Sequence, residues 1–194
     1  MSAVRVTNAP AAKPAPRRFT VKEYYRMAKA GILKEDDRVE LIEGEIICIP
    51  PIGPGHQGDT DHLRNVFAAR LAGRALVRVQ RPVRLNGFSE PQPDLLLLRP
   101  RADYYRNAHP SPGDVLLLVE VSDRSLVYDR GRKLRIYGRF GIPEVWIVNI
   151  RRREIEVYRR PGGERFEEVA TLAPGQAIAP IAFPDGVLQV SDIV

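Results

Sequence analysis

Two uninterrupted apolar runs constrain this chain more than any other feature. Residues 94–98 read DLLLL, and residues 115–121 read VLLLVEV. Runs of this kind form strands that are covered on both faces, in the middle of a sheet. Helical patterns lie around them at 59–72 and 126–140. We therefore expect an α/β or α+β fold, with a mixed central β-sheet flanked by helices.

The composition indicates one globular domain. Of the 194 residues, 44% are hydrophobic and 28% are charged, and the formal net charge is +6. This charge is compatible with an acidic partner such as nucleic acid, but it is not sufficient evidence for one. Cys48 is the single cysteine, which excludes an internal disulfide and a cysteine-cluster zinc site. No apolar run is long enough for a membrane span or a signal peptide, so we expect a cytoplasmic protein that does not enter a membrane.

Turn-forming residues and changes in composition divide the chain into segments. Residues 1–18 are rich in Ala, Pro and basic groups, which predicts a flexible N-terminal tail, or else a nucleic-acid-binding arm. Thr20 and Glu23 form a capping box that starts a helix, and a single domain is expected over 19–194. The Pro/Gly-rich segment 50–55 predicts a loop. The remaining strands are expected at 75–85 and 144–149, with β-hairpins near the N-terminus at 38–49 and near the C-terminus at 154–171.

Two acids interrupt the apolar runs. Asp94 opens the first run directly after Pro93, and Glu120 lies near the end of the second. Charges on buried strands need partners. Either acid alone is compatible with an exposed strand end. Together they indicate a metal site, because convergent carboxylates bind hard divalent ions such as Mg²⁺ through oxygen.

A lysine lies on the apolar face of the helix that follows Glu120. At about 100° per residue, Lys133 shares its face with Ile136, Tyr137 and Phe140, whereas the neighbouring arginines lie on the solvent face. It could be a structural partner of Asp129 one turn earlier. However, only one of the chain's five lysines lies after residue 34, so arginine is the usual cation here. A compact ammonium at this position favours a functional role.

These residues resemble a known motif and a known family. Pro93-Asp94 followed by Glu120 resembles the PD-(D/E)xK nuclease superfamily, which has the restriction endonuclease-like fold. More specifically, the chain is similar to the Uma2 family, also called DUF820, whose members are described as endonucleases. The resemblance covers about 18–194, and the blocks that carry it are VEVSDRS at 119–125, YDRGRKLRIY at 128–137, GIPEVWIV at 141–148 and RVELIEGE at 38–45.

The chain departs from the strict motif at one position. A strict ExK would place lysine at 122, where this chain has Ser122. In the family the lysine is displaced onto the following helix, which matches Lys133. Lys133 is also the residue that stands out on the apolar face of this helix.

The resemblance implies an Mg²⁺-dependent endonuclease, with Mn²⁺ as an alternative ion. Asp94 and Glu120 would hold the metal with the carbonyl of Val121, and Lys133 would assist catalysis. Glu40 or Glu43 would add a third acid; because they are three apart, only one can face the site from a strand. His56 and Gln57, expected in the Pro/Gly-rich loop, would line the site.

The resemblance also implies partners. The substrate would be nucleic acid, expected to be DNA, and restriction-like folds often form homodimers. Basic side chains could contact phosphates without reading sequence, and the candidates are Arg81, Arg84, Arg124, Arg130 and Arg132. Two alternatives remain: a catalytically inactive module that keeps the fold and binds nucleic acid, and a protein-interaction module with a large apolar surface patch.

Overall fold

The computed structural model describes residues 15–123 and 125–194. The predicted tail therefore lies largely outside the described residues, and only its last part, 15–18, is seen, as exposed coil. No helix within the described ranges is long and apolar enough to cross a bilayer.

A six-stranded mixed sheet forms the centre of the molecule, in the order β3-β4-β5-β6-β7-β8. The two apolar runs become β4 and β5, which pair antiparallel inside the sheet, whereas β5 and β6 pair in parallel. This confirms the predicted mixed sheet. The strands are β3 (Leu76–Val79), β4 (Leu95–Leu98), β5 (Val115–Ser122), β6 (Glu144–Asn149), β7 (Glu154–Gly162) and β8 (Arg165–Leu172).

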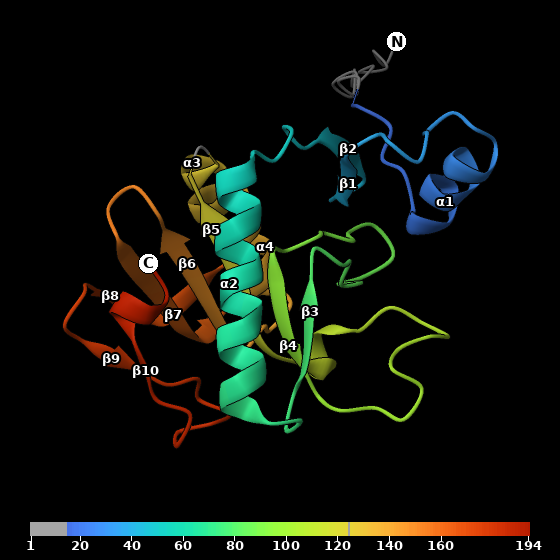
Figure 1. Ribbon diagram of the computed structural model, residues 1–194. Coiled ribbons are helices and arrows are strands. Elements are labelled where there is room, and N and C mark those ends of the chain that lie inside the picture. Colours follow the sequence, from blue (N-terminus) through green and yellow to red (C-terminus); the bar gives the residue numbers. More distant parts are fainter. Residues whose placement is uncertain (1–14, 124) are drawn as a thin grey trace, which may run out of the picture.

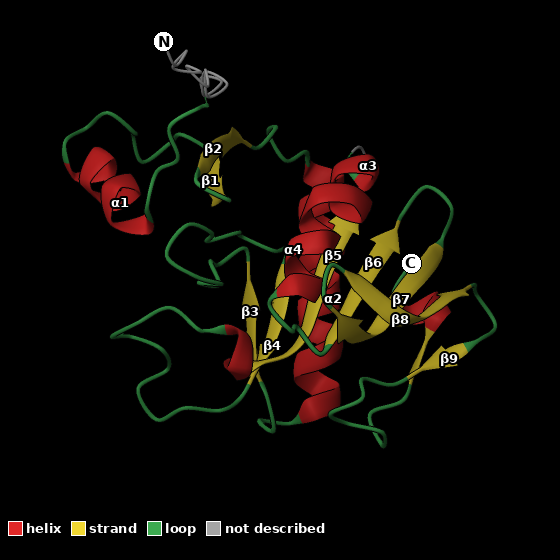
Figure 2. Cartoon of the chain, turned by 180° about the vertical axis from the view of Figure 1, so that it is seen from behind, coloured by secondary structure: helices red, strands yellow, loops and turns green. Residues whose placement is uncertain are grey.

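Helices cover both faces of this sheet. The long helix α2 (Pro54–Leu71) crosses one face, as Figure 1 shows, and buries Leu63, Phe67 and Leu71 against it. The other face is covered by a helical segment that is divided into α3 (Leu126–Tyr128), a π-helical turn η2 (Asp129–Lys133) and α4 (Leu134–Arg139). In Figures 1 and 2 the N-terminal end of α2 lies beside α3 and the end of β5.

The smaller elements surround the sheet. The helix α1 (Val21–Lys29) begins at the predicted capping box, and β1 (Val39–Ile42) and β2 (Glu45–Cys48) form the predicted N-terminal hairpin. Its two-residue turn, Glu43–Gly44, has positive φ at both positions, as a tight hairpin requires. The remaining short elements are η1 (Pro112–Asp114), β9 (Ala177–Ile178), β10 (Leu188–Gln189) and η3 (Val190–Asp192).

Two predicted boundaries were wrong. The predicted strand 75–85 ends at Val79, because Gln80 turns the backbone to positive φ. The predicted loop 50–55 overlaps α2, which begins at Pro54 rather than near residue 59. Proline is compatible with the first helical position, since that N–H has no partner within the helix.

Candidate active site

The strand pair β4–β5 brings the two predicted acids together. Leu95 pairs with Val119, so Asp94, one residue before β4, comes opposite Glu120 on the same face of the sheet. Asp94 is held there by its Oδ2, which accepts the backbone N–H of Val121 at 2.9 Å. Glu120 is 2% exposed.

The π-helical turn η2 positions the predicted lysine. Lys133 is 7% exposed, and its Nζ lies 3.2 Å from Oε1 of Glu120 and 3.6 Å from Oε2 of Glu40. Asp129, the alternative partner considered from the sequence, instead accepts hydroxyl hydrogen bonds from Ser122 at 2.7 Å and Ser125 at 2.6 Å. The ammonium is therefore directed at the acids from β5 and β1.

The first hairpin contributes one acid to this cluster. Glu40 on β1 is 1% exposed, and its Oε2 accepts the backbone N–H of Gln92 at 3.0 Å. Glu43 lies in the hairpin turn instead, where it pairs with Arg139 at 2.6 Å. The structure thus brings Glu40, and not Glu43, to Lys133.

His56 reaches the site from a helix, not from the predicted loop. It lies in the first turn of α2, and its Nε2 is 2.9 Å from the carbonyl oxygen of Val121 and 3.3 Å from Oδ2 of Asp94. Thr60, one turn later, donates its hydroxyl to the His56 carbonyl at 2.7 Å. Gln57 is exposed in the same turn of α2.

The cluster has more carboxylates than cations. Burial raises the pKa of Glu120 well above its usual value, the charge of Lys133 opposes this shift, and Asp129 and Asp94 add to it. Burial by itself would lower the pKa of Lys133, but the acids around it, Glu120 first, raise that pKa above its ordinary value. The hydrogen bond to Asp94 raises the pKa of His56. Lys133 therefore stays charged, and the cluster can accept more positive charge.

Two tyrosines for which the sequence predicted no role complete the site. Tyr137 is fully buried and donates its hydroxyl to Oε1 of Glu120 at 2.5 Å. Tyr128 donates to Oε1 of Glu40 at 3.4 Å. Tyr137 follows Lys133 by one helical turn on the apolar face, so its position next to the lysine could be predicted from the sequence. Its hydrogen bond to Glu120 could not.

Most of the arginines predicted to contact phosphates are paired within the protein. Arg84 donates to Glu90 at 2.6 Å, Arg130 pairs with Glu156, and Arg132 donates to Glu45 at 2.8 Å. Arg81 is exposed. Arg124 lies outside the described residues.

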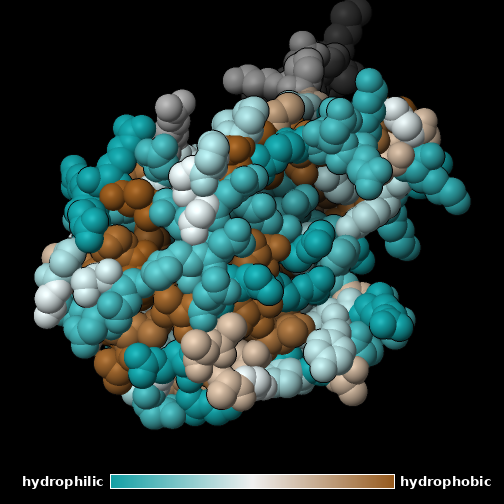
Figure 3. Space-filling view, viewed as in Figure 1, coloured by the Kyte–Doolittle hydropathy of each residue, from teal (hydrophilic) through white to brown (hydrophobic). Residues whose placement is uncertain are grey.

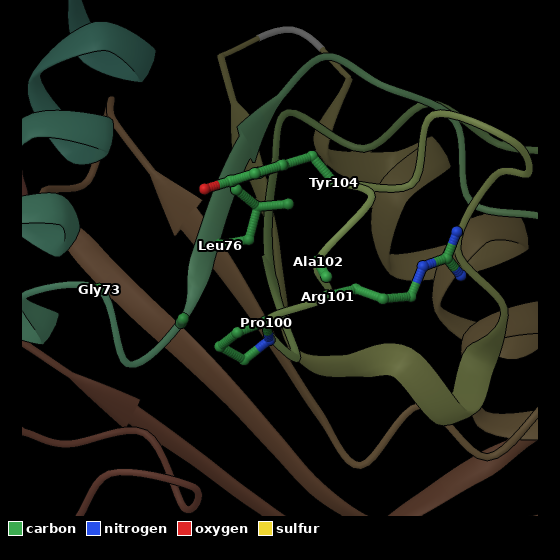
Figure 4. Close-up of a pocket in the computed structure, with 7 residues that line it drawn as sticks. Gly73, Leu76, Pro100, Arg101, Ala102 and Tyr104 are labelled. Carbon is green, nitrogen blue, oxygen red and sulfur yellow. The ribbon is translucent and has the colours of Figure 1, made fainter.

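One cavity of the structure is lined by residues away from this site. It has a volume of about 390 Å³ and lies at the opposite end of β3 and β4, where Tyr104 extends across Leu76 and Arg101 points away (Figure 4). Nothing in it matches the predicted chemistry. No group of three or more His, Cys, Asp or Glu side chains in 15–123 and 125–194 is arranged to hold a metal ion. Any metal bound by Asp94 and Glu120 would therefore take further oxygen donors, such as a backbone carbonyl, water or the substrate.

Comparisons with known proteins identify the family and the fold of the chain. The model of the Uma2 family, described as "Putative restriction endonuclease", matches residues 21–191. The chain is also similar to a crystal structure described as a "putative nuclease belonging to DUF820" from Anabaena variabilis ATCC 29413, with a TM-score of 0.68 and 16% sequence identity over 90% of this chain and 97% of that chain. That likeness confirms the predicted fold. No curated protein matches the chain.

Proposed function

Because this chain belongs to the Uma2 family, we propose that it is a metal-dependent nuclease that hydrolyses phosphodiester bonds of nucleic acid, with DNA as the expected substrate. The family description and the shared fold support a nuclease. The observation that carries the metal-dependent mechanism is the convergence of Asp94, Glu120 and the Val121 backbone at the end of the β4–β5 pair.

The donor set fits a hard divalent cation. Two carboxylates and a backbone carbonyl offer the oxygen ligands that Mg²⁺ and Mn²⁺ take. Four acids surround one ammonium and one imidazole in the cluster, so an added cation would balance its charge; the acids are Asp94, Glu120, Glu40 and Asp129. Asp94 and Glu120 would hold the ion together with the Val121 carbonyl.

Each side chain then has a role that follows from its contacts. The ion would polarise the scissile phosphate and lower the pKa of a bound water. Lys133, between Glu120 and Glu40, would orient the attacking water or stabilise the charge that develops on the phosphate. Tyr137 fixes the carboxylate of Glu120, and His56 fixes that of Asp94.

Cleavage by purified variants tests this proposal. The wild type should cut plasmid DNA with Mg²⁺ or Mn²⁺ and stop in EDTA. Asp94→Asn and Glu120→Gln should each lower the rate by about 10³-fold, the upper scale for removing one group that stabilises a transition state. Glu43→Gln, outside the cluster, is the matched control and should cut like the wild type. Equal cutting by the wild type and both site variants would indicate a contaminating nuclease and contradict the proposal.

Metal binding can be measured without cleavage. Mn²⁺ should raise the unfolding temperature of the wild type, because a ligand that binds only the folded state stabilises it. Glu120→Gln should lose this shift. A wild type that binds DNA but gains neither stability nor cutting from any divalent ion would be the inactive binding module instead.

Two implications of the family resemblance remain predictions. Light scattering in solution would test the expected homodimer. The expected cytoplasmic location needs a cellular measurement.

A further inference from the structure

The edge strand β3 places an arginine beside the candidate active site. Arg78 pairs with Leu96 in the β3–β4 register, and the hydrogen bond from the Gln80 N–H to the Asp94 carbonyl, at 3.0 Å, continues this pairing. Arg78 is therefore the diagonal neighbour of Asp94 on the same face of the sheet. Diagonal neighbours lie about 7–8 Å apart, within reach of long side chains.

The guanidinium of Arg78 is not fully satisfied by hydrogen bonds. Within the described part of the chain, its Nη1 is the one buried side-chain nitrogen or oxygen without a hydrogen-bond partner. A buried donor left unpaired destabilises the protein, and a ligand that accepts a hydrogen bond from it would relieve this cost. Burial and then the positive charge of Arg81 lower the pKa of Arg78, so a second cation lies close to it.

The acids close to Arg78 in the sequence already have hydrogen-bond or ion-pair partners. Glu90 accepts hydrogen bonds from Arg84 at 2.6 Å and from Tyr25 at 2.5 Å. Asp103 pairs with Arg101. Residues 72–111 hold seven arginines against three acids, and the third acid is Asp94 itself. Neither Arg78 nor Arg81 pairs with any of these three acids, so the acids do not balance the charge of these two arginines.

We propose that Arg78 and Arg81 form a binding site for a backbone phosphate of the nucleic-acid strand, next to the phosphate that is cut. This inference rests on the proposed function. Phosphates follow each other about every 3.4 Å of helix axis along one strand, so a site about 7–8 Å from Asp94 fits a phosphate near the scissile one. Guanidinium groups suit phosphate because they donate two parallel hydrogen bonds. Contacts of this kind position the strand and do not read its sequence.

Binding measured in EDTA tests the site without cleavage. The anisotropy of a short fluorescein-labelled DNA duplex is titrated with the full chain at several salt concentrations. Arg78→Met and Arg81→Met should each weaken binding by about tenfold. Each should also reduce the slope of log K against log salt by about 0.9, the loss of one phosphate contact. A labelled RNA duplex of the same sequence is titrated in parallel. The comparison shows whether the site prefers the phosphates of DNA or of RNA.

Matched controls separate binding from folding. Arg64→Met and Arg70→Met remove exposed arginines of α2, on the other side of the sheet, and should leave the slope unchanged. Because Arg78 is half-buried, Arg78→Lys is the second variant: it keeps the charge and should retain the salt slope while losing part of the affinity. An Arg78→Met protein that unfolds at the wild-type temperature and binds both duplexes like the wild type would overturn the phosphate site.

The outcomes for the two proposals are distinguishable. If the arginine variants lose affinity while no divalent ion supports cutting, the phosphate site stands and the nuclease proposal fails. If cutting depends on metal and on Asp94, but the arginine variants bind and cut like the wild type, only the phosphate site fails.

Discussion

The two faces of the central sheet are stabilised in different ways. Under α2 the packing is apolar, and Phe67 lies against Trp146 with ring centroids 5.8 Å apart. Under η2 and α4 a similar apolar core gives way, at the end of β5, to the buried cluster around Lys133 and Glu120. Apolar burial stabilises a fold directly, whereas a buried ion pair must first offset the desolvation of its charges. The second face thus keeps charges that stability alone does not require.

The helices show the same difference. The helix α2 is regular over 18 residues, whereas the segment over the other face contains the π-helical turn that carries Lys133. Turns of this type are rare and are frequent at functional sites. The surface seen in Figure 3 has hydrophobic areas that are interrupted by hydrophilic side chains, which does not favour a purely protein-interaction role for that face.

Among the variants that compare the two faces, Lys133→Met should have the largest effect on stability. It leaves the carboxylates of Glu120 and Glu40 buried without their cation, which should cost about 3–5 kcal/mol of unfolding free energy. Cleavage should fall by about 10²-fold or more. Chemical denaturation and a cleavage assay measure the two effects.

The same variant has a pH dependence with a defined sign. Burial raises the pKa of Glu120, and loss of the lysine charge should raise it further. A carboxyl group with a raised pKa in the folded state loses its stabilising contribution as pH rises, so the variant's deficit should be larger near about pH 8 than near about pH 5. The double variant Lys133→Met/Glu120→Gln should regain stability without regaining cleavage. Recovery of both would contradict the catalytic roles proposed for Lys133 and Glu120.

Phe67→Ala probes the apolar face. Removal of this fully buried ring should lower the unfolding free energy by at least about 3 kcal/mol. This loss should not depend on pH, because the packing partners are apolar. Phe67→Leu is the matched control and should lose less, since it leaves a smaller cavity. A pH-dependent loss would mean that the two faces are coupled.

Tyr137→Phe should have the smallest effect of the three. It removes one hydroxyl that donates to Glu120 and keeps the ring in the core. We expect a loss of about 1 kcal/mol in stability and about tenfold in cleavage. The affinity for Mn²⁺ should weaken as well, because Glu120 loses the group that fixes it. Unchanged Mn²⁺ affinity, measured by calorimetry, would contradict the positioning role of Tyr137.

The sequence by itself determined the mixed sheet, two of its interior strands and the family. The strands at 94–98 and 115–121 could be predicted because burial on both faces leaves a continuous apolar run. Lys133 could be identified because it interrupts the apolar face of a helix. These signals are local. Each depends on residues that are close together in the chain.

Only the tertiary structure decided which side chains meet. The choice of Glu40 over Glu43, the contact of His56 with Asp94 and the bond from Tyr137 to Glu120 each join segments that are distant in sequence. The start of α2 at Pro54 and the π-helical turn also depend on packing against the sheet, which overrides local preference. The unpartnered nitrogen of Arg78 is a further case, because whether a donor is satisfied depends on everything that surrounds it in space.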